Sequence, residues 1–140
     1  MLTLFANNVL LRGFLGKNAD APPSHGITED SFAVLLLATV SGRWDLGNNE
    51  WIPRTDFHRI ICPGPFFCGM VRGMRRGDYL EVEGELRALE QERGVVVAGE
   101  RFPVKHSTYA VHAVRLQRLD RPEALVDYGD SDDGNREVQP

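Results

Sequence analysis

The chain has 140 residues, which is within the usual size range of one globular domain. Hydrophobic residues make up 42% of it and charged residues 26%, a composition that excludes fibrous, low-complexity and disulfide-scaffold proteins. No apolar run approaches the roughly 18 residues of a membrane span, and the first eight residues lack the basic stretch of a signal peptide. We therefore expect a cytoplasmic protein in which Cys62 and Cys68 are reduced thiols.

The net charge of −4 is unevenly distributed along the chain. Residues 120–140 hold seven acidic and two basic side chains, a balance of −5, which leaves residues 1–119 at +1. Because the acidic segment has few apolar groups, burial cannot offset the entropy lost on ordering it. We expect one domain over residues 1–119, followed by an acidic, disordered tail over residues 120–140.

The apolar pattern is mostly that of strands. Strand patterns occur in five segments, namely residues 10–15, 31–39, 54–62, 78–87 and 108–119. Residues 32–38 are apolar on both faces, which predicts a central strand. In the third segment Phe57 and Arg59 alternate with Ile60 and Cys62, which predicts one solvated face and one buried face.

One helix is expected between the third and fourth strands. Apolar residues at 66, 67, 70, 71 and 74 follow helical spacing, despite two glycines in this stretch. Turn-forming residues mark three connections, over residues 18–29, 42–53 and 88–107. Five strands with a helix between the third and fourth is the connectivity of the OB-fold, an all-β barrel that binds oligonucleotides on its second and third strands.

Four blocks of the sequence strengthen this interpretation. They are residues 7–16 (NNVLLRGFLG), 32–44, 55–61 (TDFHRII) and 75–87. In order and spacing they resemble the bacterial single-stranded-DNA-binding protein family, over roughly residues 5–119. The resemblance implies a non-catalytic OB-fold that forms dimers or tetramers and coats single-stranded DNA without sequence preference during replication, recombination and repair.

Binding of single strands needs flat aromatic faces for base stacking and cations that follow the phosphates. Trp44 and Phe57 match aromatic positions that the family uses for stacking, and arginines lie near both. The predicted nucleic-acid-binding residues are Trp44, Phe57, Phe14, Arg12, Arg43, Arg59, Arg75, Arg76 and Arg87. Trp51 matches no such position, and we expect it in a loop.

The sequence also departs from the family pattern. Pro63 and about Gln91 stand where the family commonly has aromatic residues, and Asn8 and Leu46 stand where it has lysines. Each phosphate that is not neutralised lowers the salt dependence of binding. We therefore expect weaker binding with a flatter salt dependence.

An acidic strand face bears on assembly. Glu81, Glu83 and Glu85 lie on the surface that the family uses to pair dimers into tetramers. They would repel a symmetric copy unless bases on the partner meet them, and a solvated strand face is the alternative interpretation. Dimer and tetramer both remain open.

The tail permits two interpretations. Residues 127–133 resemble the acidic stretch through which the family recruits replication and repair proteins, but the apolar final residues are missing. The tail could instead discourage aggregation or compete with DNA for basic side chains.

Other chemistry has little support. No phosphate-binding loop and no nucleophile elbow occur, and we expect neither an enzyme nor a cofactor. The residues His58, Cys62, Cys68, His106 and His112 lack the paired spacing of a zinc site, so no metal is expected. The alternative function is a protein-interaction module resembling primosome-type adaptors, which would bind a replication protein stably and DNA weakly.

Overall fold

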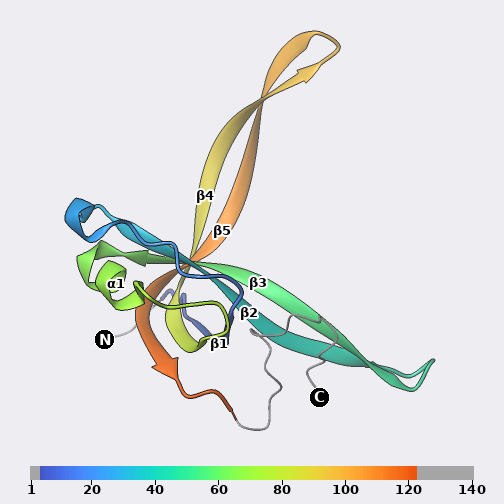
Figure 1. The fold of residues 1–140 in the computed structure, drawn as a ribbon. Helices are drawn as coiled ribbons and strands as arrows, with labels where there is room; N and C mark the ends of the chain where they lie inside the picture. Colours follow the sequence, from blue (N-terminus) through green and yellow to red (C-terminus); the bar gives the residue numbers. More distant parts are fainter. Residues whose placement is uncertain (1–3, 123–140) are drawn as a thin grey trace.

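The computed structural model describes residues 4–122. Along the chain the elements are β1 (Val9–Leu15), the 3-10 turn η1 (Ser24–Gly26), β2 (Phe32–Asp45), β3 (Glu50–Pro63), α1 (Gly64–Val71), β4 (Tyr79–Val97) and β5 (Glu100–Leu119) (Figure 1). This order confirms the prediction of five strands with a short helix between the third and fourth.

The strands form a closed barrel in the order β1-β2-β3-β5-β4. All neighbouring pairs are antiparallel except β3 and β5, which run parallel where Ile60 meets Val111 and Ile61 meets His112. This short parallel contact closes the barrel and leaves no edge strand open in it. The predicted OB-fold architecture is therefore confirmed.

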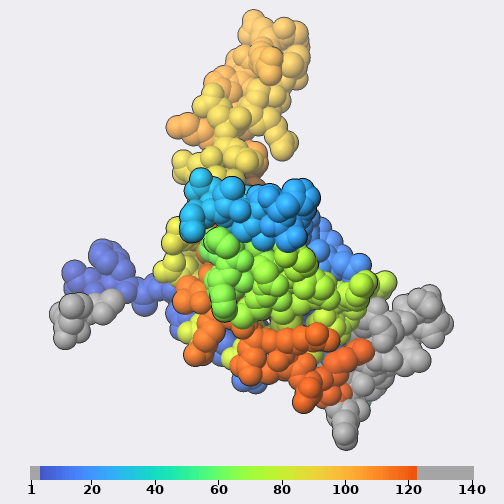
Figure 2. All heavy atoms as spheres, turned by 60° about the vertical axis from the view of Figure 1, so that its left-hand side comes forward, coloured from blue at the N-terminus to red at the C-terminus, as the bar shows by residue number. Residues whose placement is uncertain are grey.

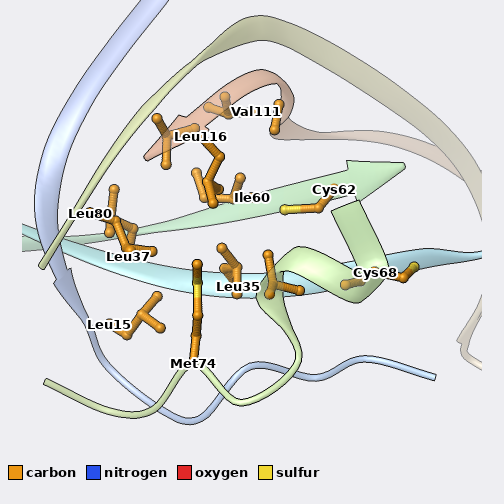
Figure 3. Packing of buried hydrophobic residues seen from close by; sticks show 14 residues of the cluster. Leu15, Leu35, Leu37, Ile60, Cys62, Cys68, Met74, Leu80, Val111 and Leu116 are labelled. Atoms are coloured by element: carbon orange, nitrogen blue, oxygen red, sulfur yellow. The ribbon is translucent and has the colours of Figure 1, made fainter. Parts of the chain in front are cut away.

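Alternate strand residues fill the barrel interior. Leu35 and Leu37 of β2 face Ile60 of β3 and Leu80 of β4, and each of these side chains is fully buried. Figure 3 shows side chains from the strands pointing toward one another, with Met74 beside Leu35. The alternation predicted for the third strand is confirmed, because Ile60 and Cys62 are buried whereas Phe57 and Arg59 are exposed. The first residues of β4 alternate in the same way, with Leu80 and Val82 buried.

Both cysteines belong to this core. Cys62 and Cys68 are free thiols with no exposed surface, and burial, followed by the proximity of Cys68, raises the pKa of Cys62 to about 12. Because both thiols are buried, and because the reactive thiolate of Cys62 is disfavoured, we expect Ellman's reagent at mildly alkaline pH to modify neither thiol of the native protein. In denaturant both should react at once. Fast reaction of the native protein would contradict the packing described for these side chains.

The prediction of two long connections over residues 42–53 and 88–107 is wrong, because paired strands run through most of both segments. The β2–β3 pairing continues to Asp45 and Glu50, and the β4–β5 pairing continues to Val97 and Glu100. Both hairpins leave the barrel, in different directions (Figure 1), and Figure 2 shows the β4–β5 hairpin standing away from the rest of the molecule. The turns themselves are short, over residues 46–49 and 98–99.

Two glycines explain the difference, because each lies inside a strand where another side chain crosses it. A β-carbon at Gly42 would lie 2.6 Å from the Trp51 ring, and one at Gly94 would meet the Arg101 guanidinium. Glycine within a strand often marks such a close approach. The turn of the second hairpin is at Ala98 and Gly99, which both have positive φ, as a two-residue hairpin turn requires.

The helix is confirmed with shifted bounds. It was expected over residues 66–74, but it ends at Val71, and Gly73 has a φ of +94° that no helix can include. Within residues 4–122, no helix is long and apolar enough to cross a membrane. The tail predicted over residues 120–140 falls, beyond residue 122, outside the described residues.

Candidate nucleic-acid interface

One face of the β2–β3 hairpin gathers the main predicted stacking residues. Residues directly opposite in an antiparallel pair share a face, and the register pairs Trp44 with Trp51, Ala38 with Phe57 and Leu36 with Arg59. Because these pairs are an even number of residues apart, all of them lie on the same face. Trp44, Phe57 and Arg59 therefore follow one another along the outer surface of the hairpin and the barrel.

Trp51 belongs to this face too, which corrects its expected place in a loop. It lies in β3 opposite Trp44, and its ring crosses Gly42. Trp44 is 50% exposed, whereas Trp51 is partly covered. The sequence signal that could have shown this is Gly42 itself, because a glycine two residues before Trp44 on the same face leaves room for the Trp51 ring to cross the strand diagonally.

Phe57 has a solvent-exposed ring with firm support beneath it. Its side chain is 56% exposed, and its ring lies close to Gly16, where a β-carbon would be 3.1 Å away, with Leu36 beside it. A ring that is held from below and open above can take a base on its free side.

Arg43 lies on the other face of the same hairpin. The alternation that turns Trp44 to one side turns Arg43 to the opposite side, where it lines a shallow hollow of about 290 Å³ with Ile52 and Arg54. The Nε atom of Arg54 donates to Asp56 Oδ1 at 3.1 Å. Arg43 thus flanks Trp44 in the sequence but does not share its face.

Phe14 is close to this surface but covered. Ala38 pairs with both Phe14 and Phe57, so the three residues form a row across three strands. The Phe14 ring centroid is 5.0 Å from that of Tyr79, and the Arg121 guanidinium lies 5.6 Å above the Phe14 ring. Only 6% of Phe14 is exposed, so its ring has no open face for a base.

Arg12 and Arg87, two of the predicted phosphate-binding arginines, form ion pairs with the acidic strand. Arg12 Nε donates to Glu81 Oε2 at 2.8 Å, and Arg87 donates to Glu85 Oε1 at 3.1 Å. The hydrogen bond and the charge of Glu81 raise the pKa of Arg12. Exposed ion pairs contribute only about 0–1 kcal/mol each, so either arginine can exchange its carboxylate for a phosphate at small cost.

The three other predicted arginines differ in their surroundings. Arg75 and Arg76 lie in the turn between α1 and β4, where their backbone amides donate to Asp78 and Asn18, both at 2.9 Å. Arg59 lies in a groove together with Arg87. In the described part of the chain, the side chains of Arg59, Arg75 and Arg76 form no hydrogen bond or ion pair.

The histidine beside Phe57 forms a structural hydrogen bond. His58 Nε2 and the Thr39 hydroxyl share a hydrogen bond of 2.8 Å between β3 and β2. Cys62 and Cys68 are in the core, whereas His112 lines the outer groove with Arg59. The structure therefore does not bring these residues together as ligands for one metal ion.

The carboxylates on the acidic face of β4 form ion pairs with arginines of the same chain. Glu81 binds Arg12, and Glu83 accepts a hydrogen bond of 2.9 Å from Arg115. Arg118 is 3.4 Å from Asp78 on the same sheet. The repulsion expected between two copies of this strand is thereby reduced without bases from a partner.

The comparisons with known proteins bear on this fold. The sequence matches no family model and no curated protein. Its structure is similar to the SSB of Plasmodium falciparum solved in complex with ssDNA, with a TM-score of 0.63 at 23% identity over 86% of this chain and all of that one.

The chain has the OB-fold of single-stranded-DNA-binding proteins. A deletion mutant of the Thermus aquaticus protein gives a TM-score of 0.61 at 21% identity, covering 82% of this chain and 51% of that one. A small Streptomyces coelicolor single-stranded DNA-binding protein gives 0.52 at 16% identity, over 79% and 92% of the two chains. The predicted resemblance is confirmed at the level of the OB-fold.

Proposed function

We propose that this chain is a divergent, non-catalytic member of the single-stranded-DNA-binding family. It binds single-stranded DNA without sequence preference and protects it during replication, recombination and repair. The observation that carries the proposal is the outer face of the β2–β3 hairpin, where exposed aromatic rings and an arginine follow one another along one line. The proposal is also supported by the three similar solved structures, which are all of single-stranded-DNA-binding proteins.

The chemistry of this face suits contacts that do not depend on base identity. Every base has a π face, and stacking on Trp44, Trp51 or Phe57 needs no hydrogen bond to a base edge. Arg59 lies two residues beyond Phe57 on the same face, about 7 Å along the strand, where its guanidinium can reach a phosphate while a base occupies the ring. Stacking then supplies affinity, and the arginines supply attraction for the backbone.

The salt dependence of binding tests the role of Arg59. Each phosphate neutralised by a cation contributes about −0.7 to the slope of log K against log salt for single strands. We expect Arg59→Gln to reduce the magnitude of that slope by about 0.7, for every oligonucleotide sequence tested. Fluorescence titrations over a series of salt concentrations measure it.

The matched control is Arg72→Gln. Arg72 is an exposed arginine directly after α1 that donates to the Pro22 carbonyl oxygen at 2.9 Å, and it belongs neither to the aromatic face nor to the β1–β4–β5 sheet. Its replacement removes the same charge and should leave the slope unchanged. Equal changes in the two variants would show that net charge, and not the position of Arg59, determines the effect.

The proposed assembly is a homo-oligomer formed through the β1–β4–β5 sheet. Leu10 and Val114 are 56% and 64% exposed there, and the carboxylates between them are already paired with arginines. A sheet with exposed apolar residues and internally balanced charge can meet a copy of itself.

The proposed division of the chain keeps residues 1–119 as the DNA-binding domain and residues 120–140 as an acidic appendage. Arg121, the second residue of this appendage, lies against the barrel with its guanidinium above the Phe14 ring. The recruitment of replication or repair proteins by the rest of the appendage is part of the proposal and rests on the resemblance of residues 127–133.

A further inference from the structure

A groove of about 460 Å³ opens where the β4–β5 hairpin leaves the barrel. Its walls come from the start of β2, the end of β3 and the base of the hairpin, and its main lining residues are Phe32, Arg59, Ile61, Arg87, Tyr109 and His112. In Figure 2 the segment leading into β2 lies directly below the base of the hairpin. The groove therefore joins parts of the chain that are far apart in the sequence.

Two aromatic side chains in the groove are more exposed than buried. Phe32 is 53% exposed and Tyr109 is 63% exposed, and Leu89 beside them is 56% exposed. Concave surfaces that combine aromatic residues with a few polar groups are the usual form of a ligand site. Neither aromatic residue was among the site residues predicted from the sequence.

The polar groups of the groove favour an anionic ligand. Arg59 and Arg87 both line it, and among the residues described here no carboxylate does. Burial, and after it the charge of Arg87, lowers the pKa of His112, against the opposing effect of Glu85. The lowered pKa favours the neutral imidazole of His112, which can offer a hydrogen bond beside Arg59 and the Arg87–Glu85 ion pair.

The groove continues the aromatic face of the β2–β3 hairpin. Phe57, Arg59 and Ile61 follow one another on the same face of β3, and Arg59 and Ile61 line the groove. Phe32 pairs across the strands with Pro63, the next position on that face. Pro63 is one of the two positions where an aromatic residue was expected and is missing. Phe32 thus places a ring on the face that Pro63 leaves without one.

We propose that this groove is a second nucleobase-binding subsite, in which a base of the bound strand stacks on Phe32 and Tyr109 and its flanking phosphates contact Arg59 and Arg87. The proposal rests on the proposed function, because it assigns the path of the same strand beyond Phe57. It implies that the strand turns from β3 toward the base of the β4–β5 hairpin. The missing aromatic residues then cost less affinity than the sequence suggests.

The first test is the double variant Phe32→Ala, Tyr109→Ala, titrated with oligo-deoxythymidine. Losing one stacked base raises the dissociation constant roughly 5- to 150-fold. The tryptophan quenching at saturation should stay as in the wild type, because Trp44 and Trp51 lie outside the groove. The matched control is Phe32→Tyr, Tyr109→Phe, which keeps both rings and should keep the affinity within about twofold.

The second test locates the base directly. An iodouracil-substituted oligonucleotide, irradiated in complex with the wild-type protein and digested, should give mass-spectrometric adducts on Phe32 or Tyr109 as well as on the β2–β3 face. Adducts confined to Trp44, Trp51 and Phe57, or wild-type affinity in the double alanine variant, would overturn the subsite and leave the proposed function standing. A wild-type protein that neither binds nor cross-links would overturn the proposed function itself.

Discussion

Phe57→Ala is expected to raise the dissociation constant for oligo-deoxythymidine roughly 5- to 150-fold, which is about 1–3 kcal/mol for one stacked base. The physical reason is the position of the ring, which is open to solvent on one side and supported by Gly16 and Leu36 on the other. No polar group has to be desolvated to use it. Fluorescence anisotropy of a labelled oligonucleotide measures the change without relying on the tryptophans.

The control for Phe57 is Phe57→Tyr, which keeps the ring and should bind as the wild type does. Since the side chain is 56% exposed, the alanine variant should unfold at nearly the wild-type temperature. If Phe57→Ala were folded and bound the oligonucleotide with unchanged affinity, the assignment of this face to base stacking would be wrong.

Leu35→Ala should reduce the free energy of unfolding by about 2–5 kcal/mol. Leu35 is fully buried, pairs across the strands with Ile60 and lies beside Met74 (Figure 3). Its removal both loses the transfer free energy of the side chain and leaves a cavity that the closed barrel cannot collapse to fill. Urea denaturation followed by circular dichroism measures the loss.

Leu46→Ala is the matched control for this stability effect. Leu46 is 86% exposed in the turn between β2 and β3, and its replacement should change stability by no more than about 0.5 kcal/mol. A loss at Leu35 as small as that at Leu46 would mean that the alternation of β2 is shifted by one residue, which would turn its core face outward.

The barrel could be predicted from the sequence because its strands alternate clearly. In β3, Ile60 and Cys62 face the core while Phe57 and Arg59 face solvent. In β4, Leu80 and Val82 face the core while Glu81 and Glu83 lie on the outer face. The far ends of the hairpins could not be predicted in the same way. They have no core to face, so their residues alternate in no useful pattern, and Gly42 and Gly94 resemble turn residues although each makes room for a side chain from the opposite strand.

The candidate site was only partly predictable. Trp44, Phe57 and Arg59 lie together on one face, as their positions in the sequence suggested. The covering of Phe14 by Tyr79 and Arg121 depends on residues more than 60 positions away along the chain, and no local pattern reports it.

The same limit applies to the groove. Phe32 begins β2 and Tyr109 lies in β5, and the closure of the barrel through the β3–β5 contact brings them to one surface. The sequence shows proline, and not an aromatic residue, at position 63. Only the strand register shows that Phe32 lies directly across from Pro63 and supplies a ring there.

The most direct test of single-strand binding is a tryptophan-fluorescence titration of the wild-type protein with oligo-deoxythymidine at low and at moderate salt. Both tryptophans lie on the proposed binding face, and Trp44 is half exposed, so stacking should quench its emission. The expected result is strong, saturable quenching whose midpoint moves to higher oligonucleotide concentration as salt is added. An unchanged emission spectrum at micromolar protein, with no shifted band in a gel, would contradict single-strand binding and favour the protein-interaction module.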